Sequence, residues 1–466
     1  MSETQPGPAD AEGPERTERD PRALAEAPEP PQLPGTPVLG NTLGFVRDPF
    51  GFYDRLESVG DAVGYSVAGR EFCTVFEPDY VEQILVEDNE RFVKSEAFRD
   101  AAAGFAERGL LLTEGEEWRD QRVRIQPAFT PDRIRSYADA MVTYAERTLD
   151  HLADGEVVDV QDAMSELTLR ILAKSLFDID VEGRREVVRE AAAALNERGD
   201  AGGASAFLPD WVPTPKNRRF ERAMTDFEAM VDDLVAERRA DDAEYDDLLS
   251  LLLRAEGPDG ETMAEEVVGD QLVTFLFAGH ETTALALTYA WHLLGRNPDE
   301  AEKLRAELDA TLGDDPATIA DLPDLGYTER VVREALRLYP PAYVLFREPT
   351  EDVRIGPYRI EAGTNLTLPA FKLHRDGRFY DAPDEFRPER WTADFEDDLP
   401  DYAYFPFGGG PRHCIGMRFA MTELRLVLAT MAREVAFEPV YEGDPDLAMS
   451  ATLKPTTEMR MRVRKR

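Results

Sequence analysis

The residues best suited to chemistry lie in one short stretch, FGGGPRHCIG, which runs from Phe407 to Gly416. Three glycines and a proline hold the backbone in turns ahead of Cys414, and a helix is expected to begin just after it. Free backbone N–H groups and the helix dipole would lower the pKa of the thiol, which suits a thiolate to ligate a metal. Arg412 is placed to pair with an anionic group beside that metal. Phe407 is placed to cover the sulfur, and Gly416 allows the backbone to come close.

This stretch resembles the haem-binding signature Phe-x-x-Gly-x-Arg-x-Cys-x-Gly of the cytochrome P-450 family, with all five fixed positions filled. The resemblance implies haem b ligated by Cys414, in a mainly α-helical fold with small β-sheets around the buried haem. The thiolate would donate electron density that favours O–O cleavage. An isolated cysteine is more often a small buried hydrophobe, but five matches at fixed spacing are rare by chance.

A second stretch, AGHETT from Ala278 to Thr283, resembles the family's Ala-Gly-x-Glu/Asp-Thr-Thr/Ser. Glycine and two threonines in a buried helix are expected to loosen its hydrogen-bond ladder, because a threonine hydroxyl can bond the carbonyl four residues earlier. The resemblance places Ala278 in the groove over the haem. It implies that the Thr282 hydroxyl stabilises activated oxygen and that Glu281 relays protons.

Glu334 and Arg337 match the family's Glu-x-x-Arg, which alone carries little weight because several solvated helix pairs show the same spacing. Their place distinguishes them, since they follow the AGHETT helix and precede Cys414 by 80 residues (414 − 334). Downstream, FRPERW resembles the family segment whose Arg390 would complete a buried triad with Glu334 and Arg337. The triad would lock the loop that presents Cys414, and a buried carboxylate requires such pairing.

Residues 109–129 resemble the helix that brackets the haem propionates. Trp118 and Arg122 are four residues apart and therefore share one helical face. Arg347 matches a family arginine that also reaches a propionate. With Arg412, these residues would supply the cationic cluster that two buried carboxylates need.

The other candidate residues favour structural explanations. Cys73 lies in an apolar strand and is expected to pack in the core. His151, His292 and His374 have no histidine partner four residues away, so a zinc site is not expected. No Gly-x-Gly-x-x-Gly follows a strand, and no phosphate-binding loop is present, which argues against a nucleotide or flavin domain.

The composition excludes several functional classes. The 466 residues contain 53 Lys and Arg against 93 Asp and Glu, a net charge of −40 that argues against nucleic acid and anionic membranes as partners. Only seven of the basic residues are lysine, and the carboxylates are spread along the chain. We interpret this as a salt-adapted (haloarchaeal-like) cytoplasmic protein, although an acidic protein from a GC-rich genome fits as well. Two cysteines indicate a reducing compartment.

The elements that position these motifs are mostly helices. The hydrophobic period predicts helices over 48–57, 116–126, 133–153, 162–177, 182–198, 215–240, 263–296, 298–311, 327–338 and 416–433. Two alternating runs, 62–67 and 71–76, predict a hairpin, and strands return after 340. Residues 1–31 are expected to be a disordered acidic tail. No signal peptide or membrane span is evident, and 32–466 are expected to form one domain rather than the three that length suggests.

The function that the resemblance implies is that of a monomeric haem-thiolate monooxygenase, which inserts one atom of O2 into an organic substrate. Two alternatives stay open: a peroxygenase or isomerase that needs no electron donor, and a non-catalytic haem sensor. The expected donor is a ferredoxin reduced by an NAD(P)H-dependent reductase, with docking that improves with salt because both surfaces are acidic. The substrate is expected to be hydrophobic, a lipid or an isoprenoid (carotenoid-like) molecule, because aromatic residues dominate the pocket candidates Phe98, Phe105, Phe275, Phe277, Tyr343, Leu345 and Phe346.

Overall fold

A computed structural model of the protein describes residues 21–179, 183–199, 214–240, 247–255, 260, 262–313 and 315–466. Its helices are α1 (Pro21–Glu26), α2 (Thr42–Arg47), α3 (Pro49–Glu57), α4 (Pro78–Glu82), α5 (Glu96–Ala101), α6 (Gly115–Ile125), α7 (Pro131–His151), α8 (Val160–Phe177), α9 (Arg185–Gly199), α10 (Pro215–Ala240), α11 (Leu248–Arg254), α12 (Glu265–Arg296), α13 (Pro298–Thr311), α14 (Gly326–Leu338), α15 (Ala370–Leu373), α16 (Ala393–Asp398) and α17 (Met417–Glu434). The predicted mainly helical fold is confirmed.

The strands are short and form four small sheets. They are β1 (Ala62–Val67), β2 (Arg70–Val75), β3 (Phe92–Val93), β4 (Val157–Asp159), β5 (Leu345–Pro349), β6 (Val353–Ile355), β7 (Tyr358–Ile360), β8 (Asn365–Leu368), β9 (Val435–Pro439), β10 (Leu447–Met449), β11 (Leu453–Pro455) and β12 (Arg460–Lys465). The sheet orders are β1-β2-β8-β5-β3, β4-β12-β9, β10-β11 and β6-β7. Among the strands in the described part of the chain, only β2 and β8 pair in parallel.

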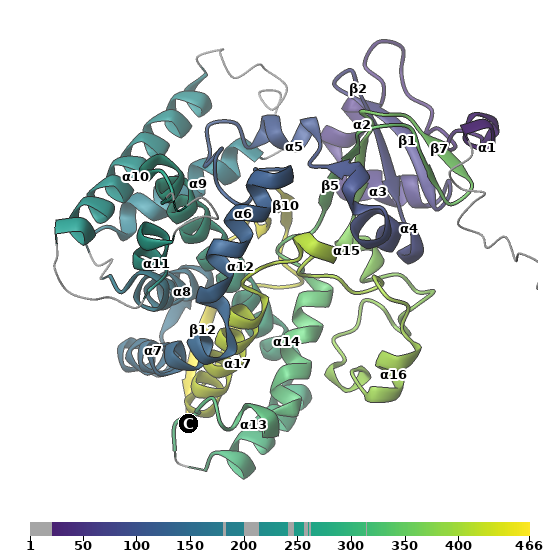
Figure 1. The fold of residues 1–466 in the computed structure, drawn as a ribbon. Coiled ribbons are helices and arrows are strands. Elements are labelled where there is room, and N and C mark those ends of the chain that lie inside the picture. Colours follow the sequence, from purple (N-terminus) through teal and green to yellow (C-terminus); the bar gives the residue numbers. More distant parts are fainter. Residues whose placement is uncertain are drawn as a thin grey trace, which may run out of the picture.

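Helix α12 runs through the middle of the helical part, with α8 beside it (Figure 1). From Val268 to Leu294 its buried residues face in every direction. A helix that is apolar all round must lie inside other elements, which accounts for the position of α12. After one residue, Asn297, Pro298 begins α13, because proline cannot continue the ladder of the preceding helix but is favoured in a first turn.

The two sides of the molecule differ in character. Helices α8, α9, α10 and α11 gather on one side, whereas β1 and β2 with α1–α4 lie on the other (Figure 1). Between them the chain of Cys414 passes from a 3₁₀ turn, Gly410–Arg412, into α17. The loop of Cys414 therefore lies where the two sides meet.

Most predicted elements are present within three residues of the predicted bounds, including the hairpin β1–β2, whose turn residues Ala68 and Gly69 have φ angles of 54° and 78°. Helix α11 was missed because seven residues, LLSLLLR, are too few to show a period. Of the predicted tail, residues 1–20 lie outside the described residues. In the rest, α1 is helical and the Pro31 carbonyl accepts from the Gly64 N–H at 2.9 Å.

Candidate active site

Cys414 lies in a loop whose path only glycine permits. Gly410 has a φ of +63°, and a Cβ there would overlap the backbone carbonyl of Leu85, so no other residue fits. The N–H of Cys414 donates to the Phe407 carbonyl at 2.9 Å, which closes the loop on itself. The loop thus presents the thiol from a fixed backbone.

Cys414 is an exposed residue whose thiol is nevertheless desolvated by the surrounding protein atoms. Burial raises its pKa, although a backbone hydrogen bond from Gly416 and the charge of Arg122 act in the opposite direction. The predicted lowering of the thiol pKa is therefore wrong, because desolvation outweighs the two opposing effects. The residue nevertheless keeps accessible surface. A desolvated sulfur with accessible surface has room beside it for a ligand.

Helix α12 contributes a partly exposed stretch in its otherwise buried middle. Phe277, Ala278, Gly279 and Thr282 all keep some accessible surface. The Thr282 hydroxyl donates to the Ala278 carbonyl at 2.7 Å, and that of Thr283 donates to the Gly279 carbonyl at 3.0 Å. The predicted hydroxyl–carbonyl bonds are therefore confirmed.

The helix nevertheless stays unbroken from Glu265 to Arg296. A Cβ on Gly279 would lie 2.7 Å from Leu172 Cδ1, which shows that this glycine accommodates the close packing of α8. Gly279 therefore serves packing against α8, and the groove over the haem stays a prediction.

Glu281 is buried and turns toward α9 and the β10–β11 turn. Its Oε1 accepts hydrogen bonds from Asn196 Nδ2 and from Thr452 Oγ1, the latter at 3.4 Å, while Oε2 has no partner. Burial raises the pKa of the carboxyl, and the charge of Lys454 opposes this. A buried carboxyl with a raised pKa is suited to carry a proton.

Three cations gather in the interior near the Cys414 loop. Arg347 and Lys94 are each 9% exposed, and Arg412 lies close to both. The Arg412 guanidinium pairs with Glu114 and stacks over the Trp118 ring, 4.4 Å from its centroid. The structure thus brings together Trp118, Arg347 and Arg412, with Lys94 as a member that the sequence analysis missed.

Arg122 is not part of this cluster in the structure. Its Nη1 donates to the His413 carbonyl at 3.0 Å, and its guanidinium lies beside the thiol. Although Trp118 and Arg122 share a helix, their polar groups reach different partners. That Trp118 and Arg122 both reach a propionate therefore stays a prediction.

The cationic cluster fits a ligand with two negative charges. Burial and the charges of Arg347 and Arg412 lower the pKa of Lys94 to about 7, and burial and Arg412 lower that of Arg347 to about 10. Glu114 is the one acid that opposes these shifts. Three cations with one carboxylate leave an excess that two propionates would neutralise. The accessible Cys414 sulfur and the exposed stretch of α12 fit the iron and the ring of a haem.

Glu334, Arg337 and Arg390 form a buried cluster. Arg337 donates to both carboxylate oxygens of Glu334, at 2.9 and 2.8 Å, and Arg390 Nε donates to Oε1 at 2.9 Å. The Trp391 indole N–H, which was not predicted, donates to Oε2 at 3.0 Å. Arg337 also donates to the carbonyls of His374 and Pro383, so the cluster connects α14 to the chain that leads to Cys414.

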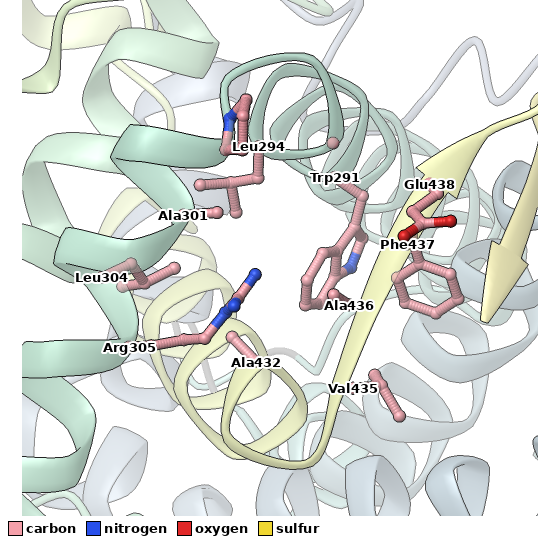
Figure 2. Close-up of a pocket in the computed structure, with 12 residues that line it drawn as sticks. Trp291, Leu294, Ala301, Leu304, Arg305, Ala432, Val435, Ala436, Phe437 and Glu438 are labelled. Carbon is pink, nitrogen blue, oxygen red and sulfur yellow. The ribbon is translucent and has the colours of Figure 1, made fainter. Parts of the chain in front are cut away.

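A cavity of about 190 Å³ lies away from this site, between α12, α13, α17 and β9 (Figure 2). Figure 2 shows the Arg305 side chain reaching into it opposite Trp291, with Phe437 of β9 beyond. Trp291 is nine residues beyond Thr282, about 13 Å along the helix axis. In the parts of the chain that the structure describes, no three His, Cys, Asp or Glu residues form a metal-binding group.

Comparison with known proteins agrees with the geometry. Residues 30–462 match the sequence profile of the family described as Cytochrome P450. The chain is 34% identical to cyclooctat-9-en-7-ol 5-monooxygenase of Streptomyces melanosporofaciens over 91% of this chain and 94% of the relative. It is 33% identical to pentalenene oxygenase of Streptomyces avermitilis over 92% and 95%. Protein LUTEIN DEFICIENT 5 of Arabidopsis thaliana is 29% identical over 93% and 77%.

Proposed function

The chain belongs to the cytochrome P450 family, and on that premise we propose that it inserts one oxygen atom of O2 into a terpenoid substrate. It is an oxidoreductase, and like other members of its family it binds haem b. One observation carries the proposed site: the accessible sulfur of Cys414 lies in a desolvated space, with a buried excess of positive charge nearby.

Each residue of the proposed site has its own role in binding haem or in handling protons. Cys414 is the thiolate ligand of the iron, and Lys94, Arg347 and Arg412 bind the propionates. A haem bound in this way supplies O2 activation, which the thiolate favours by donating electron density. The Thr282 hydroxyl lies on the exposed stretch of α12 and can turn from the Ala278 carbonyl toward a ligand in the space. Glu281 holds a proton behind it, and Glu334 with its two arginines fixes the loop of Cys414.

Spectroscopy tests the ligand assignment directly. The reduced protein under CO should show the long-wavelength Soret band of a thiolate-ligated haem, and Cys414→Ala should lose it. A matched Cys73→Ala variant should keep the band, because Cys73 is a buried core residue whose pKa burial raises to about 12. An unchanged Soret band in Cys414→Ala would overturn the assignment.

The aromatic side chains that the sequence predicts for the pocket support an apolar substrate. Phe105 packs edge-on against Phe277 at 5.1 Å, and Phe98 stacks on Phe346 at 5.9 Å. The nearby cations are occupied: Arg108 pairs with Asp270 at 3.1 Å, and Arg99 lies 3.7 Å from Glu348. No polar anchor therefore competes with apolar contact among these residues.

Phe275 lies on the other side of α12 from Phe277. It stacks on Phe129 at 5.6 Å, and a Cβ on Gly416 would lie 3.8 Å from Phe129. Residues two positions apart on a helix differ by about 200° around its axis, so Phe275 and Phe277 face opposite sides. A place for Phe275 among the pocket aromatics therefore stays a prediction.

The names of the relatives support a terpenoid substrate. Cyclooctat-9-en-7-ol 5-monooxygenase and pentalenene oxygenase act on terpenoids. Incubation with O2, NAD(P)H and a ferredoxin system should convert cyclic terpene hydrocarbons or alcohols to products one oxygen heavier. A low-spin to high-spin shift of the haem reports which candidates bind. If only small polar compounds gave that shift, the substrate proposal would be wrong.

A ferredoxin-type protein, reduced by an NAD(P)H-dependent reductase, is the proposed electron donor. Exposed apolar residues occur beside the thiolate loop: Val123 is 68% exposed and follows Arg122, which contacts His413, and Met417 is 37% exposed three residues after Cys414. An apolar patch next to the iron ligand suits transient docking. Because the whole chain carries a charge of −40, we expect docking to an acidic donor to improve with salt.

We also propose that the protein is salt-adapted, cytoplasmic and monomeric. The negative charge is spread over the surface, so it destabilises the folded chain in dilute buffer and is screened in brine. Among the described residues, no helix has both the length and the apolar character that crossing a bilayer requires.

A further inference from the structure

The partners of Glu281 come from segments far away in the sequence. Asn196 lies on α9, and Thr452 lies between β10 and β11, yet both reach the same carboxylate oxygen. Glu281, Asn196 and Thr452 are 7%, 6% and 3% exposed. This is a closed polar network inside the protein, with one proton-carrying group at its centre.

The hydrogen bonds of Asn196 fix the orientation of its amide. Its Nδ2 donates to the Ala192 carbonyl at 3.0 Å and to Glu281, while its Oδ1 accepts from Ser450 Oγ at 3.1 Å and from Thr452 Oγ1 at 3.2 Å. Both donors are thus used, and two hydroxyls lie within reach of Oδ1, although each has a second acceptor: the Thr452 carbonyl for Ser450 at 2.9 Å and Glu281 for Thr452. A flipped amide would aim its oxygen at a carbonyl and a carboxylate, so the network permits one orientation.

Thr452 has one proton and two acceptors. Its hydroxyl lies 3.2 Å from Asn196 Oδ1 and 3.4 Å from Glu281 Oε1, and it can donate to only one of them at a time. Asn196 therefore donates a hydrogen bond to Oε1 continuously, whereas Thr452 donates one to it only part of the time. Oε2 has no partner among the described residues and is the oxygen left for proton exchange.

Taking the proposed function as its basis, we propose that Asn196 is a positioning residue for Glu281. It holds Oε1 so that Oε2 alone accepts and releases the proton for oxygen activation. The Thr452 hydroxyl strengthens the hydrogen bonding of Oε1 whenever it donates to this oxygen. Proton supply then depends on the position of α9 and of the turn between β10 and β11, both of which lie outside α12.

The charges that face Glu281 are few. Lys454 on β11 favours the ionised carboxylate, and it also opposes protonation of His280, the neighbour of Glu281 on α12. Burial lowers the pKa of His280 to about 4, so this ring is neutral near neutral pH. No described residue forms an ion pair with Glu281. The neutral donors Asn196 and Thr452 are thus its direct contacts, which leaves its proton exchangeable.

Infrared spectroscopy of the haem-loaded protein tests the proposal without turnover. The C=O band of protonated Glu281 is identified by its loss in Glu281→Gln, and its intensity is followed against pH. Because the Asn196 bond favours the ionised form, Asn196→Leu should raise the midpoint by about one pH unit. Thr452→Val should raise it by a smaller amount. Thr430→Val is the matched control, since Thr430 is buried on α17 with its hydroxyl unpaired, and its midpoint should not move.

Turnover gives the second readout. In Asn196→Leu the share of consumed NAD(P)H recovered as product should fall at least about twofold, and the alkaline limit of this share should shift with the infrared midpoint. An unchanged midpoint in Asn196→Leu overturns the inference. If Asn196→Leu does not fold, the midpoint of Thr452→Val against Thr430→Val decides. A shifted midpoint in a protein without any O2-dependent turnover would support the positioning role and overturn the proposed function.

Discussion

Lys94 and Arg347 lie close enough for their charges to repel each other, beside the end of the β3–β5 pair. In this pair Phe92 pairs with Pro349 and Val93 with Glu348, Lys94 follows the last residue of β3, and Arg347 lies on β5. Both are buried, and the charge of Arg347 opposes protonation of Lys94. Like charges buried close to each other destabilise the fold unless an anion lies between them.

Replacement of Lys94 by methionine should therefore weaken haem retention in the haem-bound protein and stabilise the haem-free protein. With haem bound, loss of a charged contact to a propionate should speed haem loss at least about tenfold. Without haem, the free energy of unfolding should rise by about 1–4 kcal/mol, because a buried cation is removed. Haem transfer to an acceptor protein and urea denaturation of the haem-free protein measure the two effects.

The pH dependence of the haem-free protein provides a control for Lys94. Its pKa of about 7 in the folded state lies below the value of about 10.4 in an unfolded chain. The unfolded chain thus binds more protons between these values, and stability rises with pH across that window. This slope should be smaller in Lys94→Met and unchanged in Lys303→Met on the exposed face of α13. Parallel profiles would contradict the assignment.

Glu334→Gln should destabilise the protein by about 3–5 kcal/mol, because Arg337 and Arg390 would lose the charge that compensates their burial. Denaturant unfolding followed by far-UV circular dichroism measures the change. The matched control is Glu186→Gln, which breaks the exposed pair with Arg189 at the same spacing of three residues. No measurable change is expected there. An equal loss of unfolding free energy in the two variants would show that burial of the Glu334 cluster does not contribute to stability.

Glu423→Met should stabilise the protein above about pH 5. Glu423 is fully buried on α17, both of its oxygens lack a partner, and burial raises the pKa of the carboxyl well above its usual value. The folded chain thus binds more protons, and wild-type stability falls as pH rises above about 4.5.

The gain in Glu423→Met should reach about 1–4 kcal/mol near pH 8 and shrink toward pH 5. Thermal unfolding across this range measures it, with Glu302→Met on the surface of α13 as the control. A variant less stable than wild type at pH 8 would disprove this account.

Val123→Glu should slow reduction by the ferredoxin several-fold, since it places a charge in the apolar patch beside the thiolate loop. Stopped-flow reduction under CO measures the rate. Val440→Glu, at a position 46% exposed at the end of β9, should leave the rate unchanged. Reduction should also become faster as salt is added to dilute buffer. A rate that falls steeply with salt would contradict an acidic docking pair.

The melting temperature should rise as KCl is added from about 0.1 M to 1 M, because the screening length falls from about 10 Å to about 3 Å. Other monovalent salts should act alike, since screening depends on ionic strength. Differential scanning calorimetry measures the transition. A melting temperature that stays flat or falls would refute salt adaptation.

The sequence predicted the long helices well because their burial follows a regular period. It also predicted Glu334 with its arginines, since that motif has a fixed order along the chain. Lys94 was missed because one lysine after two strand residues resembles any surface cation, and its burial depends on the pairing of β3 with β5.

Asn196 left a signal that could have been found. It follows Val188 and Ala192 at spacings of four, so it lies on the buried stripe of α9, where a lone polar residue needs a partner. The identity of that partner, however, depends on how α9 packs against α12. Side-chain directions such as that of Arg122 likewise arise from tertiary contacts and leave no pattern in the sequence.

The sheet β4-β12-β9 has a consequence for how the protein reaches its fold. Its central strand, β12, pairs with Val157–Asp159, a segment about 300 residues earlier in the chain. Loop closure over such a separation is costly, so this pairing can form only after the intervening helices have collapsed. Folding should accordingly be slow and pass through populated intermediates. During that interval the apolar faces of α8 and α12 are open to chaperones and to aggregation.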